Sequence, residues 1–285
     1  MSGKGIVRTG TAGWVYAPWR GEFYPPGLPQ KQELAYAGTH LGAIEINATF
    51  RALQKPQSFR NWASQTPEDF VFAIKGPQLV THVRRLRDVA TPLANFFASG
   101  PLALGRRLGP FVWQLPPNLA YDADRLEDFL ALLPSSPEAA ADLAGRHEAW
   151  MTQAATDAAG VSAIRHAIEV RHESFATPGF IAQLRRHNVA LVVADTTQWP
   201  TCDVTADFVY CRLQGAPGKD GYDAADLERW AARLAAWAEG RPPADAAVLA
   251  DSPEPRPRDV FAFFVSTDKL HAPANAMAVA RMLAG

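Results

Sequence analysis

Eight short hydrophobic segments recur along the 285 residues of this chain, and helix-like segments separate them. Strands that alternate with helices indicate parallel βαβ units. Eight such units at this length favour closure into a barrel. We therefore expect an α/β fold, a single (β/α)8 TIM-barrel domain over residues 1–285. The predicted strands are Ile6–Thr11, Ala43–Asn47, Phe70–Lys75, Phe111–Leu115, Ala167–Arg171, Ala190–Asp195, Phe208–Arg212 and Val260–Val265.

The segments between these strands have the apolar spacing of amphipathic helices. The predicted helices are Gln30–Leu41, Pro56–Ser64, Thr91–Leu104, Gly179–Asn188, Asp223–Glu239 and Ala274–Leu283. The alanine-rich region 122–160 is expected to hold two more, broken at Pro134–Pro137. No Gly-x-Gly-x-x-Gly turn follows the first strand and no P-loop sequence occurs, which argues against the usual nucleotide-binding folds.

The charge balance and the cysteine content narrow the class of protein. Lys and Arg number 28 against 29 Asp and Glu, a formal charge of -1, so net charge gives no support to a nucleic-acid or anionic-membrane partner. Cys202 and Cys211 are too few for a zinc site or a disulfide framework, and reduced cytosolic thiols are expected. No apolar run approaches the ~20 residues of a membrane span. We expect a soluble, cytoplasmic protein without a membrane partner.

Polar residues gather at the C-terminal ends of the predicted strands, where TIM barrels build their active sites. They are Glu45, Asn47, Lys75, Gln114, Glu169, Arg171, Asp195 and Arg212. Because side chains alternate across a strand, Glu169 and Arg171 share one face. The pattern predicts that these side chains converge in one polar pocket.

Three carboxylates and three cations in this set each need a partner, a ligand or a shifted pKa. The functional interpretation is a pocket in which cations hold an anionic group and carboxylates do acid–base work. The candidate catalytic residues are Glu45, Lys75, Glu169 and Asp195, and the candidate substrate-binding residues are Trp14, Tyr24, Asn47, His82, Gln114, Arg171 and Arg212. The alternative is a self-satisfied salt-bridge network that only fills the barrel mouth.

The sequence leaves two interpretations open for the aromatic loop and for His82. The aromatic loop at residues 13–29, with Trp14 and Tyr24, could wall the pocket or form a small satellite core. His82, after the third strand, could contribute an imidazole or be a lone surface histidine. A metal site is not expected, because no predicted strand end carries a histidine and three cations lie among the carboxylates. No cofactor is expected.

The chain resembles the domain-of-unknown-function 72 family, the YecE-like proteins. The matching stretches are Gly10-Thr11-Ala12-Gly13-Trp14, Trp19, Phe23-Tyr24-Pro25, Glu45-Ile46-Asn47-Ala48-Thr49-Phe50, Trp62, Phe72-Ala73-Ile74-Lys75, Thr81-His82, Leu108-Gly109-Pro110, Gln114-Leu115-Pro116-Pro117, Glu169-Val170-Arg171-His172, Asp195, Tyr210-Cys211-Arg212-Leu213 and Asn275-Ala276. The resemblance spans nearly the whole chain in order. It implies a TIM barrel and no established reaction.

Three positions depart from the family pattern. Gln214 stands where the family usually has histidine, Arg51 where a tyrosine is typical, and Val265-Ser266-Thr267-Asp268 where Phe-Asn-Asn-Asp is usual. The leading hypothesis is an enzyme acting on a small polar or anionic metabolite, phosphorylated, carboxylate or sugar-like. The departures favour the runner-up, a non-catalytic ligand-binding or scaffold protein. Nucleic-acid processing is a third hypothesis, which the neutral net charge argues against.

Overall fold

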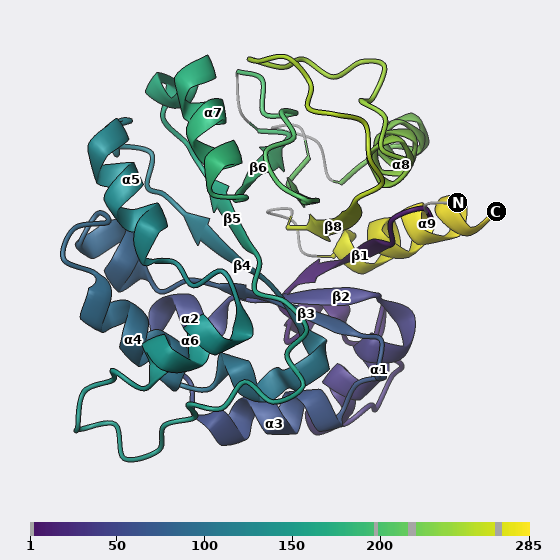
Figure 1. Ribbon diagram of the computed structural model, residues 1–285. Coiled ribbons are helices and arrows are strands. Elements are labelled where there is room, and N and C mark those ends of the chain that lie inside the picture. Colours follow the sequence, from purple (N-terminus) through teal and green to yellow (C-terminus); the bar gives the residue numbers. More distant parts are fainter. Residues whose placement is uncertain (1–2, 197–198, 216–220, 266–269) are drawn as a thin grey trace. The chain divides into compact units, whose positions relative to one another are not determined.

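The computed structural model describes residues 3–196, 199–215, 221–265 and 270–285. Eight parallel strands close into a barrel in the order β1 to β8, which confirms the predicted (β/α)8 fold. Each predicted strand overlaps one of the observed strands (Figure 1). These are β1 Val7–Ala12, β2 Ala43–Ile46, β3 Val71–Lys75, β4 Leu108–Gln114, β5 His166–Glu169, β6 Ala190–Ala194, β7 Phe208–Leu213 and β8 Asp259–Phe264.

The helices are α1 Glu33–His40, α2 Ala48–Arg51, α3 Pro56–Ser64, α4 Ala90–Ala98, α5 Ala123–Leu132, α6 Pro137–Ala144, α7 Pro178–Arg186, α8 Ala224–Ala238 and α9 Ala272–Ala284. The predicted break between α5 and α6 is confirmed. The helix predicted to reach Leu104 ends at Ala98, because Gly100 has a φ of 121°, and a 3-10 segment follows. The short helix α2 and a π-helical turn at Leu79–Val83 were not predicted.

Side-chain caps explain where four of the helices begin. The side chains of Asp122, Ser136, Thr177 and Asp223 each accept a hydrogen bond from the backbone N–H three residues later. Such caps satisfy one of the N–H groups that a helix start leaves without an intrahelical partner. Pro137 and Pro178 then occupy the first turns of α6 and α7, where a missing N–H costs nothing.

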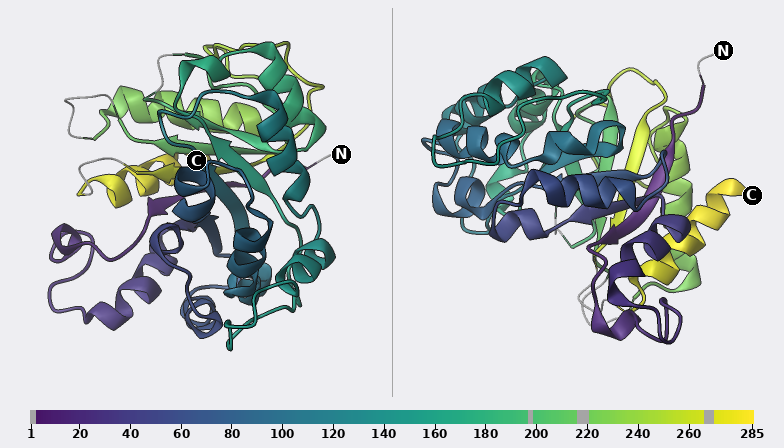
Figure 2. Two further views of the ribbon diagram at one scale, coloured as in Figure 1. Left: turned by 90° about the vertical axis from the view of Figure 1, so that its left-hand side faces the viewer. Right: turned by 90° about the horizontal axis from the view of Figure 1, so that it is seen from below.

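By its contacts the chain divides into two compact units, residues 45–175 and residues 1–44 with 176–285. We call them the central unit and the terminal unit. That residues 1–285 form a single domain stays a prediction. Within the terminal unit, α8 and α9 pack against β1 and β8. The first strand and the last helix therefore lie side by side (Figures 1 and 2).

Two glycines allow close approaches that a side chain would block. A β-carbon at Gly10 of β1 would lie 1.8 Å from the carbonyl oxygen of Ala43 in the terminal unit. In the central unit, a β-carbon at Gly76 would lie 2.3 Å from the ring of Trp113. The chain that leaves β3 after Lys75 can pass Trp113 only because residue 76 has no side chain.

His166 lies in the core of the central unit, at the first position of β5. The Trp113 indole N–H donates to its Nδ1 (3.2 Å), and its Nε2 lies 2.8 Å from the carbonyl oxygen of Pro134. These partners require a neutral ring that carries its proton on Nε2. Burial lowers the pKa of His166 from 6.5 to about 4, with the bond to Pro134 acting weakly in the other direction.

Candidate functional site

Polar side chains end four strands of the barrel, and all four lie in the central unit. Glu45 is on β2, Lys75 on β3, Gln114 on β4 and Glu169 on β5. Their exposed fractions are 0%, 8%, 6% and 2%, so each is enclosed by the protein. Gln114 and Glu169 are register partners in the β4–β5 pair, which brings their side chains together. That Glu45 and Lys75 share one pocket with this pair stays a prediction.

A chain of side-chain hydrogen bonds joins three of these strand ends. The Lys75 ammonium donates to Gln114 Oε1 at 3.0 Å, and Gln114 Nε2 donates to Glu169 Oε2 at 2.8 Å. Arg171, two residues beyond Glu169, donates from Nε to Glu169 Oε1 at 2.8 Å. We call Lys75, Gln114, Glu169 and Arg171 the strand-end relay. It has an ammonium group at one end and a guanidinium group at the other.

The relay fixes the orientation of its two inner members. The Gln114 amide must turn its oxygen to the ammonium and its nitrogen to the carboxylate, since the reverse would set donor against donor. Both oxygens of Glu169 accept hydrogen bonds, and Arg171 Nη2 also lies 2.8 Å from Oε1. Protonation of Glu169 would weaken its pairing with Arg171. The geometry therefore suits Glu169 to hold Gln114 and Arg171 in place more than to accept a proton.

The motif after β2 supports the lysine end of the relay. The Thr49 hydroxyl lies 2.6 Å from the carbonyl oxygen of Lys75 and 3.1 Å from that of Ile46, so it ties the ends of β2 and β3 together. The Lys75 ammonium lies over the ring of Phe50, 4.3 Å from its centroid. Such a cation–π contact partly replaces the hydration that burial removes. Thr49 and Phe50 belong to a stretch that carried the family resemblance, although they were not predicted as site residues.

Asn47 presents a hydrogen-bond acceptor that the fold does not use. It directly follows β2 and precedes the first residue of α2. Its Oδ1 is buried and has no hydrogen-bond partner among the described residues. A buried acceptor without a partner costs free energy, and such atoms in a native protein call for an explanation. A ligand hydroxyl or N–H would satisfy this one.

His82 lies within the electrostatic field of the relay. It is on the π-helical turn, its Nδ1 is 2.9 Å from the Thr81 hydroxyl, and its ring meets Phe50 edge-on. Its pKa is lowered first by burial, and then by the positive charges of Lys75 and Arg171, against a smaller opposite effect of Glu169. The imidazole is therefore neutral at physiological pH and can accept or donate a hydrogen bond.

The aromatic loop after β1 forms its own small core in the terminal unit. Trp19 and Tyr24 are 0% and 1% exposed, and their rings pack together with those of Phe23 and Tyr36. The Tyr24 hydroxyl donates to the carbonyl oxygen of Trp14 at 2.6 Å. For Tyr24 this geometry favours the satellite-core interpretation. A substrate-binding role for Trp14 and Tyr24 stays a prediction.

In the terminal unit, the carboxylate after β6 supports a loop. Asp195 accepts hydrogen bonds from the backbone N–H groups of Gln214 (2.9 Å) and Gly215 (3.0 Å) and from the Tyr222 hydroxyl. Burial and the neighbouring carboxylate of Asp195 strongly raise the pKa of Tyr222, so the phenol stays protonated and donates. Sequence reasoning missed Tyr222. The one signal in the sequence is that Tyr222 carries a hydroxyl and lies a short distance beyond β7.

Arg212, on β7, is 5% exposed, so its side chain is buried. The catalytic role predicted for Asp195 and the binding role predicted for Arg212 stay predictions. Of the departures from the family pattern, Gln214 is half-buried beside Asp195. The residues 266–268 lie outside the described residues.

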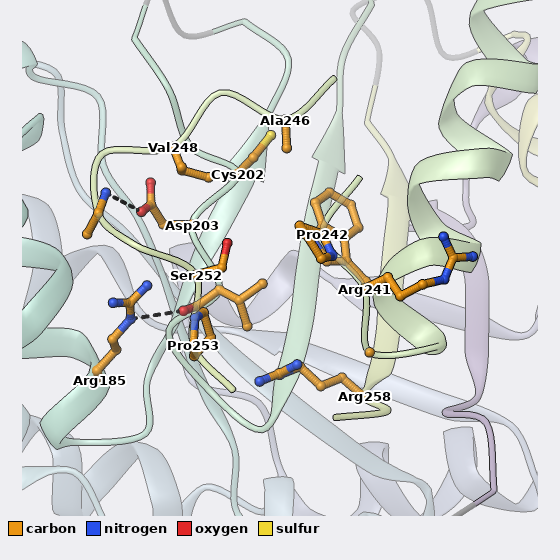
Figure 3. A pocket seen from close by; sticks show the side chains of 14 residues that line it. Arg185, Cys202, Asp203, Arg241, Pro242, Ala246, Val248, Ser252, Pro253 and Arg258 are labelled. Atoms are coloured by element: carbon orange, nitrogen blue, oxygen red, sulfur yellow. Dashed lines mark hydrogen bonds between the residues drawn. The ribbon is translucent and has the colours of Figure 1, made fainter. Parts of the chain in front are cut away.

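A small pocket in the terminal unit is closed by its own polar contacts (Figure 3). It has a volume of about 20 Å³ and suits about one water molecule. Asp203 accepts from the N–H groups of Leu249 and Ala250, and Arg185 Nε donates to the carbonyl oxygen of Val204. Cys202 lines this pocket, and burial raises the pKa of its thiol. These groups support the surrounding loops and leave no room for a metabolite.

In the described parts of the chain, no three His, Cys, Asp or Glu side chains are grouped so that they could hold a metal ion. The same residues include no helix that is long and apolar enough to cross a membrane.

Comparisons with known proteins identify the family. A family model described as "Protein of unknown function DUF72" matches residues 8–285. The UPF0759 protein YecE of Escherichia coli is 30% identical over 111 residues, which cover 39% of this chain and 38% of that protein. The UPF0759 protein YunF of Bacillus subtilis is 29% identical over 128 residues, which cover 41% and 44% of the two chains. This chain spans less than half the length of the curated relatives it matches.

Two solved structures share the fold. A DUF72 family protein from Thermotoga maritima superposes with a TM-score of 0.73 at 22% identity, over 98% of this chain and 100% of that one. A DUF72 family protein from Enterococcus faecalis gives a TM-score of 0.63 at 14% identity, over 99% and 98%. At these identities the likeness concerns the barrel alone. The family match over nearly the whole chain, together with the barrel, shows that the chain belongs to the DUF72 family of proteins of unknown function.

Proposed function

We propose that the protein is an enzyme that acts on a small anionic metabolite, phosphorylated, carboxylate or sugar-like, at the strand ends of the central unit. The strand-end relay is the observation that carries the proposal. It holds Lys75 and Arg171 at the two ends of one hydrogen-bonded chain. Lysine offers a point charge to an anion and arginine offers a planar, bidentate donor.

The energetic cost of the relay supports a functional origin. A buried charged network is often no more stabilising than well-packed apolar side chains of the same volume. Lys75, Gln114 and Glu169 are all at least nine-tenths buried at the ends of otherwise apolar strands. A barrel selected only for stability would gain by placing apolar residues there.

Three further groups of the central unit extend the donor and acceptor set. The buried Asn47 Oδ1 would accept a hydrogen bond from a ligand hydroxyl, which fits a sugar-like or hydroxylated compound. The neutral His82 imidazole and the buried Glu45 carboxylate supply the acid–base groups, and Glu169 orients the relay. We assign anion binding to Lys75 and Arg171, and proton transfer to Glu45 with His82.

A thermal-shift screen of phosphorylated and carboxylate metabolites against the full chain tests the proposal. A compound present at about a hundred times its Kd should raise Tm by about 5 °C. The combined Lys75→Met and Arg171→Ala variant should lose that rise, because both donors are removed. Mass spectrometry should then detect turnover of the stabilising compound by the wild-type chain and none by the Glu45→Gln variant.

Arg106→Ala is the matched control, since Arg106 is exposed and, among the described residues, forms its ion pair with the exposed Glu68 at 3.3 Å. This variant should keep the full ligand-induced shift. Stabilisation that survives in the Lys75→Met, Arg171→Ala variant would place the anion site elsewhere.

The alternative function is ligand binding without catalysis. It is favoured by Gln214, which stands where the family usually has a histidine and whose backbone N–H bonds to Asp195. Stabilisation by a compound that is recovered unchanged after prolonged incubation would support this alternative over an enzyme.

A further inference from the structure

A second cleft opens in the central unit, beside Phe50 but with walls of its own. Its volume is about 730 Å³, within the range of small-molecule sites. It lies between α2 and the residues after it, the π-helical turn at Leu79–Val83, the start of α4, and the segment that carries Glu148 and Trp150. None of the four relay residues lines it.

An exposed but fixed tryptophan forms one wall. Trp150 is 62% exposed, and its indole N–H donates to Glu148 Oε2 at 3.1 Å. The buried Asn95 of α4 holds Glu148 twice, because its Nδ2 donates to Oε2 (2.7 Å) and its Oδ1 accepts from the Glu148 N–H (2.9 Å). An indole that is anchored through its N–H while its ring stays accessible is arranged to stack on a flat ligand.

Two further residues of the cleft lining are apolar and exposed. Leu79 and Val83 of the π-helical turn are 43% and 65% exposed. Together with Trp150 they account for three of the large hydrophobic side chains that the described residues expose, and all three line this cleft. Exposed apolar side chains that cluster around a cavity are typical of binding sites.

The backbone of the same wall is irregular. The π-helical turn is closed by the Arg84 N–H, which donates to the carbonyl oxygen of Leu79 at 2.8 Å. Leu86 and Asp88, which follow, have φ values of 69° and 52°, in the left-handed region that disfavours residues with side chains. π-Helical turns and strained φ values both concentrate at functional sites.

Two arginines on the cleft wall can donate to an anion. Within the described ranges, no side-chain hydrogen bond or ion pair engages Arg51 or Arg84, and both are exposed. Glu148 stays negatively charged, because the hydrogen bonds from Asn95 and Trp150 lower its pKa, and these bonds occupy its Oε2. Asp88 is the other carboxylate of the lining. The lining is therefore balanced in charge, and its two guanidinium groups are the donors that a phosphate would use.

We infer that this cleft binds a nucleoside monophosphate, with the base stacked on Trp150 and the phosphate against Arg51 or Arg84. The volume accommodates a base and a ribose phosphate, the indole recognises any base through its π face, and the arginines supply the phosphate donors. The inference is independent of the strand-end function, because it uses none of the relay side chains.

Isothermal titration of the full chain with adenosine 5′-monophosphate and with adenosine tests this site. We expect one nucleotide per chain and weaker binding of adenosine. Trp150→Ala should weaken binding of the nucleotide by about tenfold or more, because base stacking on an aromatic ring is lost. Trp150→Phe, which keeps a flat ring, should weaken it by much less.

Two further variants sharpen the assignment. Arg51→Ala combined with Arg84→Ala should abolish the preference for the nucleotide over adenosine. Leu132→Ala serves as the control, since Leu132 is also an exposed apolar residue of the central unit but lines a different groove. Circular dichroism of each variant establishes that it is folded.

Three results would overturn the inference. One is the lack of nucleotide binding at millimolar concentrations. A second is an affinity that Trp150→Ala leaves unchanged. The third is binding that Lys75→Met abolishes while Trp150→Ala does not, which would place the nucleotide at the strand-end relay instead.

Discussion

In the central unit the side chains at the ends of β3, β4 and β5 bond to one another, whereas in the terminal unit the carboxylate after β6 bonds to the backbone that follows β7. Both oxygens of Glu169 accept hydrogen bonds from the side chains of Gln114 and Arg171. The oxygens of Asp195 accept hydrogen bonds from two backbone N–H groups and from the Tyr222 hydroxyl. One carboxylate fixes two other side chains and the other closes a loop.

A polar residue at a strand end can therefore bind either the backbone of a loop or other side chains. A carboxylate that satisfies backbone N–H groups replaces hydrogen bonds that the loop would otherwise make to water. A carboxylate that accepts from other side chains fixes the orientation of those side chains instead. The partner of the carboxylate, and not the strand position, separates the two cases.

The largest expected effect is an acid sensitivity of the central unit through His166. Its pKa is about 4 in the folded protein against 6.5 in an ordinary environment. Above pH 6.5 the ring is neutral in both states. Below it the unfolded chain binds the proton first, so stability falls by about 1.4 kcal/mol per pH unit until pH 4, about 3 kcal/mol in all.

Urea unfolding at pH 7 and pH 4 measures this loss, and His166→Phe should remove much of it. Hydrogen exchange at pH 4.5 should also quicken in β4 and β5 before it quickens in β6 and β7. Uniform acceleration across both units would contradict the assignment of the acid sensitivity to His166.

Next in size is a matched pair of isosteric substitutions. Glu169→Gln should destabilise the protein by about 2 kcal/mol, because it removes the charge that the partly exposed Arg171 pairs with and sets an amide nitrogen against a donor of Gln114 or Arg171. Asp195→Asn should cost about 1 kcal/mol, since its remaining oxygen still accepts from the loop. Denaturant midpoints of the two variants give the comparison. Equal losses would show that both carboxylates do the same work.

The smallest expected effect is a change in the pKa of His82 when the positive charge of Lys75 is removed. Lys75→Met keeps the shape of the side chain and removes its positive charge, so the pKa of His82 should rise toward its ordinary value. Proton NMR titration of the imidazole measures the shift. Lys55→Met, a change at an exposed lysine of the same unit, should leave the His82 titration where it is.

The barrel could be predicted from sequence because apolar strand segments and helical segments alternate along the whole chain. Apolar runs such as Phe70–Lys75 and Phe208–Arg212 are what a strand buried on both faces requires, and both are strands in the structure. The helix predicted over Thr91–Leu104 was too long, because the left-handed turn at Gly100 is a property of one residue and not of a periodic pattern. The short helix α2 has too few residues to show a period.

The candidate site could be predicted in part. The sequence predicts Gln114 and Glu169 at the C-terminal ends of the fourth and fifth strands, and the two are register partners in the β4–β5 pair. The loop contacts that surround them, such as Thr49 on the carbonyl of Lys75 and Tyr222 on Asp195, depend on turns of irregular backbone that no pattern in the sequence encodes. Whether the predicted residues share one ligand stays a prediction for the experiments above.

The π-helical turn at Leu79–Val83 has a consequence for how this protein can vary. Its hydrogen bond spans five residues, one more than in an α-helix, so the turn is in effect an α-helical turn with one inserted residue. Deleting one residue there would restore ordinary helical spacing and rotate the residues on one side of it by about 100°. Val83 would then leave the cleft wall, and His82 would lose its edge-on contact with the Phe50 ring. In relatives, a gap of one residue at this place would mark chains that have reshaped the cleft without changing the barrel.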